Sequence, residues 1–259
     1  MKTYRVRRSR PSALSLALAL ALTMLIVYLA SVSARENSAP SKTVSKTEPT
    51  SLTEAISQTE AVSQTDAGSA EVRLAAMEAD FVPEIVCADE LSARVAAANC
   101  AQTGGAGFVL ADGDQFAVIR EATLQSGGAD ALRRHAEGLT LRLSGRAQDV
   151  TAVSDAAAFL YEQAAQTGAL ANAMDAGDTG ADSVRALLNV YRTQGRRAAE
   201  ELGRIETKSD AVDMLAAAVN CALERLESAL RETSSAKMRL IHAAACAEWI
   251  SLLNNLSDL

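Results

Sequence analysis

The chain has 259 residues, with 25 lysines and arginines, 32 aspartates and glutamates and a formal net charge of −7 at pH 7. Five basic residues and no acidic one precede Pro11, so the rest of the chain carries a net charge of −12 (−7 minus 5). This balance excludes nucleic acids and anionic lipid headgroups as partners, because both require a basic face. Aromatic residues make up only 3% and alanine is abundant, which predicts a largely helical protein.

The first 34 residues predict a membrane segment. Residues 1–11 form a basic cytoplasmic head, and residues 12–34 contain an almost uninterrupted apolar run from 13 to 32. As a helix this run would be about 30 Å long, the hydrocarbon thickness of a bilayer. The basic head keeps the N-terminus in the cytoplasm. We therefore expect a single-pass membrane protein that is held in the lipid bilayer by one helix and has an extracytoplasmic C-terminal region.

A cleaved signal peptide is the alternative. Val32-Ser33-Ala34 offers the small residues of a cleavage site, although the apolar region of a signal peptide usually has only about 7–15 residues. Cleavage after Ala34 would release a free secreted protein. Either outcome places residues 35–259 outside the cytoplasm.

Residues 35–78 are predicted to be a disordered linker rich in serine and threonine. A near-repeat of six residues begins at Thr53, Thr59 and Thr65, and it has too few large apolar side chains to form a core. Such a segment is typical of a flexible tether.

Residues 79–146 are predicted to form a small domain of alternating short strands and helices. A strand over 81–87, with Pro83 at an edge or bulge, precedes a helix that begins at Asp89 and ends at Gly104. We expect the buried stripe of this helix to contain Leu91, Val95, Ala98 and Ala101.

Further elements complete a βαββαβ order in this region. Strands over 106–110 and 115–121 flank a hairpin turn at 111–114, whose Asp-Gly pair supplies the positive φ that such turns need. A second helix is expected over 129–137. The last strand begins at Leu139, and its leucines alternate inward with outward Thr140 and Arg142.

The stretch 96–143 resembles the SPOR domain, a small βαββαβ module of bacterial envelope proteins of division and sporulation. The residues that carry the resemblance are Gly104–Val109, the Asp112-Gly113 hairpin and Gln115–Ile119, which are similar to the family's "GGAGYV" and "DG.YRV" segments. The sequence of head, anchor, low-complexity linker and distal module is also similar to that family. The strand over 81–87 departs from the family's "YxVQxG" pattern, since it lacks the Gln and Gly and contains a proline.

The resemblance implies that the protein binds peptidoglycan glycan strands on the exposed face of its sheet, without covalent chemistry. The corresponding ligand-binding residues here are Gln115, Ala117 and Ile119 of the third strand and Thr140 and Arg142 of the fourth. An unrelated α+β domain, whose glycines only end helices and form a hairpin, is the alternative interpretation of the same residues.

Residues 147–259 have helical periodicity only, and the fold class we predict is therefore α+β with an all-α bundle after the small domain. The expected helices are Val150–Gln166, Ala169–Ala176, Asp182–Ile205, Ala211–Arg231 and Ala236–Leu256. The last two form an αα-hairpin. A structural scaffold, whose C-terminal bundle binds an envelope or divisome protein, is the functional alternative to glycan binding.

The four cysteines contain no CxxC pair, and no metal, cofactor or enzymatic activity is predicted. Cys221 and Cys246 lie at nearly equal distances from the turn of the αα-hairpin, which predicts that they pack against each other, either as a disulfide in an oxidising envelope or as a packed pair of free thiols. The alternative is that all four cysteines are small apolar core residues. His135 is expected at the surface, and His242 is expected to be a satisfied or half-exposed helix residue.

Overall fold

The computed structural model describes residues 69–124, 128–144, 146–206 and 209–259. The predicted basic head, membrane anchor and most of the linker lie outside these residues. The linker was predicted to reach residue 78, and this end point is wrong. β1 (Ser69–Leu74) and β2 (Met77–Cys87) already occupy residues 69–87, and Val72, Leu74 and Met77 are buried.

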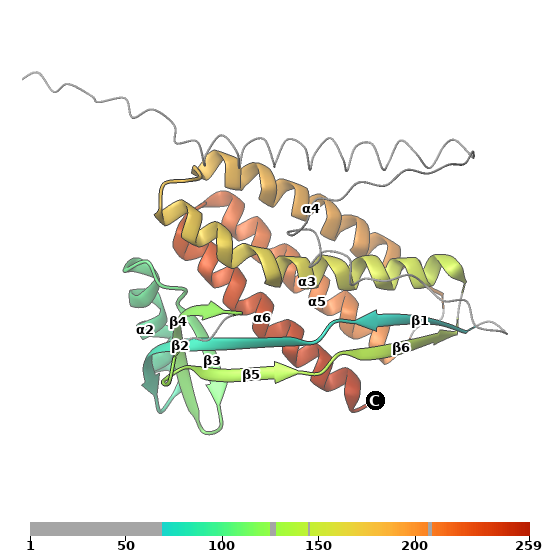
Figure 1. Ribbon diagram of the computed structural model, residues 1–259, viewed down its shortest axis with the longest axis horizontal. Coiled ribbons are helices and arrows are strands. Elements are labelled where there is room, and N and C mark those ends of the chain that lie inside the picture. Colours follow the sequence, from blue (N-terminus) through green and yellow to red (C-terminus); the bar gives the residue numbers. More distant parts are fainter. Residues whose placement is uncertain (1–68, 125–127, 145, 207–208) are drawn as a thin grey trace, which may run out of the picture. The chain divides into compact units, whose positions relative to one another are not determined.

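A long antiparallel ribbon is the base of the fold. β1 pairs with β6 (Leu139–Ser144), and β2 pairs with β5 (Leu132–Ala136). Leu74 lies opposite Leu139 and Met77 lies opposite Ala136, so the same register continues across the gap between the two ladders. Figure 1 shows β1 and β2 following one another along one side of the ribbon.

The ribbon is interrupted where a tryptophan of the last helix contacts it. The indole Nε1 of Trp249 donates a hydrogen bond of 3.0 Å to the carbonyl of Ala75, between β1 and β2. Across the gap, a Cβ on Gly138 would lie 2.8 Å from the carbonyl oxygen of Leu74. Glycine is therefore required at 138, because the two backbones approach too closely for a side chain.

A hairpin widens the ribbon into a sheet with the strand order β3-β4-β2-β5. β3 (Phe108–Asp112) and β4 (Gln115–Thr123) are joined at Gly113, whose φ is +61°, as the Asp-Gly pair predicts. The register between β2 and β4 shifts on both sides of Pro83, which confirms the expected bulge.

The predicted second helix over 129–137 is wrong, because β5 occupies this stretch. Arg133 lies opposite Asp80 on β2 and donates hydrogen bonds of 2.9 and 3.2 Å to its buried carboxylate. Pairing with β2 thus overrides the local helical pattern. The observed order is ββαββββ followed by helices, in place of the βαββαβ order that the SPOR resemblance implies.

Four helices complete the chain: α3 (Ala147–Asp175), α4 (Ala181–Gly203), α5 (Asp210–Arg231) and α6 (Ser235–Ser257). The predicted division into separate helices over 150–166 and 169–176 is wrong, since α3 continues through Gly168 as one helix. Gly168 instead allows a close approach, because a Cβ there would lie 2.7 Å from Nε2 of the buried His242 on α6. The αα-hairpin of α5 and α6 is confirmed.

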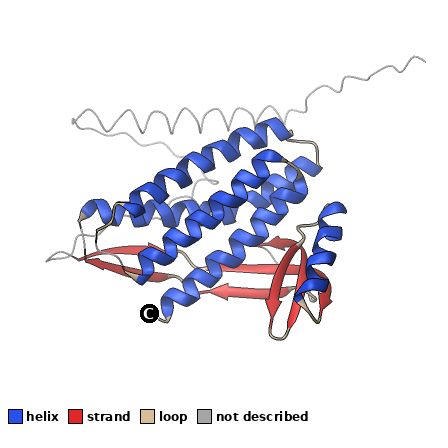
Figure 2. Cartoon of the chain, turned by 180° about the vertical axis from the view of Figure 1, so that it is seen from behind, coloured by secondary structure: helices blue, strands red, loops and turns tan. Residues whose placement is uncertain are grey.

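Strands and bundle share one hydrophobic core. α6 contacts β2, β4 and β5 of the sheet and also contacts α3 and α5 (Figures 1 and 2). Phe81 and Ile119 of the sheet belong to the same buried cluster as Leu215 and Trp249 of the helices. The predicted boundary at 146/147 coincides with the junction of β6 and α3, and the two parts on either side of it form one compact unit.

A glycine substitution tests the contact between α3 and α6. Gly168→Ala improves helix propensity but places a methyl group against the imidazole of His242, and we expect the free energy of unfolding to fall by about 1–3 kcal/mol. Gly203→Ala is the matched control, since a Cβ on this last residue of α4 meets nothing within 4 Å. It should be neutral or stabilise by up to about 1 kcal/mol. Urea denaturation followed by circular dichroism measures both; equal effects of the two substitutions would contradict the close contact.

Candidate binding surface

The five residues predicted to bind glycan do not form one surface. Gln115 is exposed at the start of β4, but Ala117 and Ile119 are completely buried. Thr140 and Arg142 are exposed on β6, as predicted, yet β6 pairs with β1 in a separate two-stranded ladder and is not a neighbour of β4. The proposed sheet face is therefore wrong.

Both faces of β4 are covered, which explains the error. Ala117 and Ile119 belong to the main core on the α6 side, whereas Val118 packs in a second cluster with α2 (Glu90–Gln102). Strand alternation alone could not show that helices cover this strand from both sides. Arg142 has a local partner, because its Nε lies 3.3 Å from Oε1 of Glu71, which is directly opposite on β1.

The predicted contact between Cys221 and Cys246 is also wrong. Cys221 is exposed on α5, Cys246 is buried in α6, and all four cysteines are free thiols. Cys221 follows the buried Val212 by nine residues, which is two and a half turns, and so it lies on the opposite side of the helix. Val219 and Ala222 face the core in its place.

Cys246 instead contacts a histidine. Its Sγ lies 3.8 Å from Nδ1 of His242 and 3.7 Å from the carbonyl of Ala164. Burial raises the pKa of the Cys246 thiol to about 12, and burial likewise lowers the pKa of His242. The pair is therefore a neutral thiol beside a neutral imidazole, the opposite of the thiolate that cysteine nucleophiles need.

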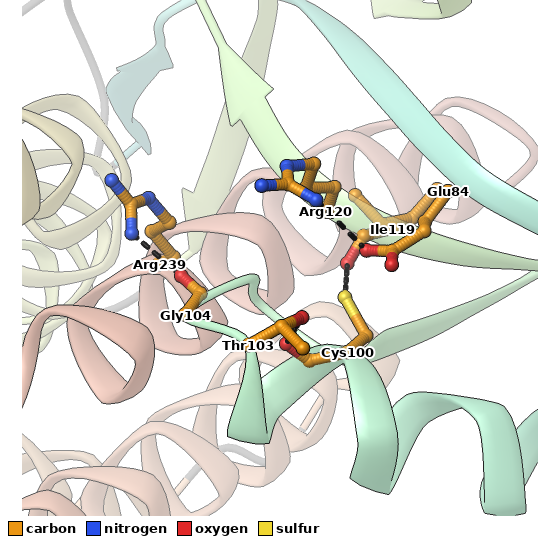
Figure 3. A network of polar contacts seen from close by, with 7 residues as sticks. All are labelled: Glu84, Cys100, Thr103, Gly104, Ile119, Arg120 and Arg239. Atoms are coloured by element: carbon orange, nitrogen blue, oxygen red, sulfur yellow. Dashed lines mark hydrogen bonds and ion pairs between the residues drawn. The ribbon is translucent and has the colours of Figure 1, made fainter.

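The glycines that carry the SPOR resemblance hold the end of α2 close to the sheet. A Cβ on Gly105 would lie 2.4 Å from Sγ of Cys100, and one on Gly107, whose φ is +60°, would lie 2.4 Å from the carbonyl of Ala97. Figure 3 shows the surrounding contacts: Sγ of Cys100 approaches the carbonyl of Ile119, and Arg239 of α6 donates a 2.6 Å hydrogen bond to the carbonyl of Gly104. These glycines have a packing role here.

Four large apolar side chains close to the junction of β2 and α2 in the sequence are exposed. Ile85 and Val86 at the end of β2 are each 49% exposed, and Leu91 and Val95 on α2 are 73% and 60% exposed. Ile85 and Val86 are consecutive on a strand and point to opposite faces of the sheet, opposite Val118 and Ala117 respectively. Leu91 and Val95 lie one turn apart on the same side of α2, and we call these two residues the tip patch. α2 lies at one end of the described unit, beside the β3–β4 hairpin (Figures 1 and 2).

α2 has apolar residues on two opposite sides, and the sequence prediction selected the wrong one. Asp89 caps the helix as expected, and its Oδ1 accepts a 2.8 Å hydrogen bond from the backbone N–H of Ser92. The buried side consists of small residues: Ala93, Ala97 and Cys100. Because small side chains let the helix lie close to the sheet, the larger Leu91 and Val95 are left facing outward. The spacing of Ala93 and Ala97, four residues apart, was the signal in the sequence that could have identified the buried side.

An acidic groove of about 240 Å³ separates α3 and α4. Its charged lining consists of Asp155, Glu162, Arg197 and Glu201. Burial raises the pKa of Glu162, and burial together with the charge of Glu201 raises the pKa of Asp155, against the lowering effect of Arg197. Burial and the charge of Glu162 also raise the pKa of Tyr191. This lining favours cationic over anionic ligands.

A small cavity of about 10 Å³ lies within the bundle. Neither side-chain polar atom of the fully buried Gln163 has a hydrogen-bond partner, and Nε of Arg225 also lacks one. The other two guanidinium nitrogens of Arg225 form a bidentate pair with Glu248. The space is about that of one water molecule, which would satisfy these atoms, and it is too small for a larger ligand.

The part of the chain that the structure describes contains no group of three or more histidine, cysteine or acidic side chains arranged to hold a metal ion. Within these same residues, no helix has the length and apolar character needed to cross a membrane. Comparisons with models of protein families, with curated proteins and with solved structures gave no match to this chain.

The groove gives a prediction about pH. Because the pKa of Glu162 is raised in the folded state, the folded protein loses stability as pH rises from the ordinary value of a glutamate through the raised one. Glu162→Gln removes this cost. We expect the free energy of unfolding of Glu162→Gln to equal that of the wild type near pH 4. At pH 7 it should exceed that of the wild type by up to about 1 kcal/mol, which corresponds to about 2–4 °C in Tm.

Glu201→Gln is the control for this measurement. Glu201 lines the same groove but accepts a 2.8 Å ion-paired hydrogen bond from Arg197, so that removing its charge should give no gain at pH 7. Thermal unfolding at a series of pH values compares the variants. A pH-independent effect of Glu162→Gln would contradict the assignment to its ionisation.

Proposed function

We propose that this protein is a membrane-tethered, extracytoplasmic binding protein that works without covalent chemistry and docks another protein surface through the tip patch. The observation that carries the proposal is the pair of large apolar side chains, Leu91 and Val95, that are exposed one turn apart on the outer side of α2. Exposed apolar clusters mark interaction sites more often than single exposed residues do. The buried thiol of Cys246 and the neutral imidazole of His242 support a non-catalytic role.

Peptidoglycan glycan strands are the second candidate ligand, and the Gly104–Val109 segment favours them through its SPOR-like sequence. Two features of the structure favour a protein partner instead. β4 is covered on both sides, and the described aromatic side chains, among them Phe81, Tyr191 and Trp249, are buried or partly buried. A sugar-stacking platform of exposed rings is thus missing from the described residues.

The proposed location rests on the N-terminal sequence. Basic residues before the apolar run 13–32 support a signal anchor with its N-terminus in the cytoplasm. In this arrangement residues 35–68 act as a tether between the membrane and the folded unit, and the tip patch is presented to the extracytoplasmic space.

Topology is tested with the full chain. A reporter that is active only outside the cytoplasm, fused after Leu259, should be active, and the fusion should remain in the membrane fraction after high-salt and carbonate washes. Replacing the five basic residues of the head by serine should lower reporter activity, because the charge bias that fixes the orientation is lost. Release of the ectodomain into the soluble fraction would show a cleaved signal peptide.

Docking is tested by photocrosslinking of the full chain in the cells that produce it. A photoreactive phenylalanine analogue at Leu91 or Val95 should give discrete adducts, whereas the same group at the exposed Val190 of α4 should not. Absence of adducts from both tip positions would contradict the proposal.

Co-sedimentation with purified cell-wall sacculi examines the glycan candidate separately. Residues 69–259 are the suitable fragment, because the sheet shares its core with the bundle and a shorter piece would expose that core. Strong retention that survives Leu91→Asp would favour glycan binding over protein docking.

A further inference from the structure

The outer face of α2 carries a regular apolar stripe. Leu91, Val95 and Ala98 follow one another at intervals of four and three residues, and all three are exposed. This spacing places them on one side of a helix, about half a turn from the buried Ala93 and Ala97. A stripe with this spacing is typical of helices that pack against another helix.

One ion pair flanks the stripe. Nη2 of Arg94 lies 2.6 Å from Oε1 of Glu90, one helical turn away, and both side chains are more than half exposed. Glu90 and Arg94 thus offer an acidic and a basic group, side by side, along one flank of the apolar stripe. Their exposure leaves both available to a second pair of charges.

This pattern is self-complementary under a two-fold axis. If a second α2 runs antiparallel across the stripe, with the axis at the level of Ala93, then Leu91 of each copy lies at the height of Val95 of the other. The same flanks meet in an antiparallel pair, so Glu90 of each copy approaches Arg94 of the other. Apolar residues meet apolar residues, and opposite charges meet.

We infer that the occupant of the tip patch is a second copy of this chain, joined through an antiparallel α2–α2 contact. The inference rests on the proposed function of the patch and names its partner. An anionic membrane surface fits less well, because the charged residues Asp89, Glu90 and Arg94 at the start of α2 sum to −1 (one basic minus two acidic) and offer no net positive charge. A shared tether at the membrane would favour the contact by raising the effective concentration of the copies.

Cysteine crosslinking of the full chain in membranes tests the register. Helices 8–10 Å apart bring facing Cα atoms at the same height to about 4–5 Å, within disulfide range. Two Leu91 residues would be offset by about 6 Å along the axis and would lie about 7–8 Å apart, beyond that range. Leu91 of one copy should therefore bond to position 95 of the other, and not to its own equivalent.

The background carries Cys87→Ser and Cys221→Ser, which remove the two cysteines that are not buried. Leu91→Cys and Val95→Cys chains, with tags of different size, are co-expressed in this background. We expect them to form a mixed disulfide. Each variant expressed alone should give at least about tenfold less dimer. Val190→Cys is the control for random collision. No mixed disulfide, or an equal yield from Val190→Cys, would overturn the inference.

An exchange of the charges at positions 90 and 94 tests the inference independently. Glu90→Arg or Arg94→Glu alone should lower the yield of mixed disulfide several-fold, because each places like charges together across the axis, and the double exchange should restore it. The inference would also be overturned if the double variant did not restore the yield of mixed disulfide although circular dichroism showed that the single and double variants were folded. Photocrosslinked adducts at Leu91 whose mass differs from that of a dimer would keep the proposed docking function and reject the second copy as its partner.

Discussion

The fold depends on the burial of α6 between the sheet and the other helices. A helix that is apolar on every side must be enclosed, and α6 has buried residues around its whole circumference, including Ala243, Ala244 and Ala245 in succession. Three of its other side chains attach it to separate parts of the chain. Trp249 bonds to the gap in the ribbon, Arg239 bonds to the end of α2 and pairs with Asp175 of α3, and His242 fills the space left by Gly168.

The position of α6 decides which surfaces remain for binding. Because α6 covers the inner face of β4 and α2 covers its outer face, the sheet that a SPOR-like protein would offer to a ligand is buried in this chain. α2 is then the outermost layer at this end of the unit. Its small buried side fits it tightly to the sheet, and its larger apolar residues face away. The proposed docking surface therefore lies on the helix that covers the sheet.

Local sequence signals predicted much of the secondary structure. The cap at Asp89, the Asp-Gly hairpin, the bulge at Pro83 and the αα-hairpin are all observed, because each depends on residues close in sequence. The errors concern long-range packing. β5 is a strand because it pairs with β2, and α3 continues through Gly168 because His242 lies against it, 74 positions further along the chain. The prediction of the binding residues was wrong for the same reason, because α6 buries Ala117 and Ile119.

Magnitudes explain how the proposed docking surface can be exposed in the isolated unit and still associate at a membrane. Complete burial of a leucine or valine side chain contributes about 1.5–3 kcal/mol. Leu91 and Val95 are 73% and 60% exposed, so burying them in two copies would contribute on the order of 4–8 kcal/mol. Association of free proteins costs about 4–15 kcal/mol. The balance is close to zero in solution, so the isolated unit can expose these residues without aggregating. When several copies are held on one membrane, part of the association cost has already been met, and the same contact becomes favourable. A weak docking helix and a membrane tether therefore suit each other physically, because neither alone would give an assembly that forms only at the membrane.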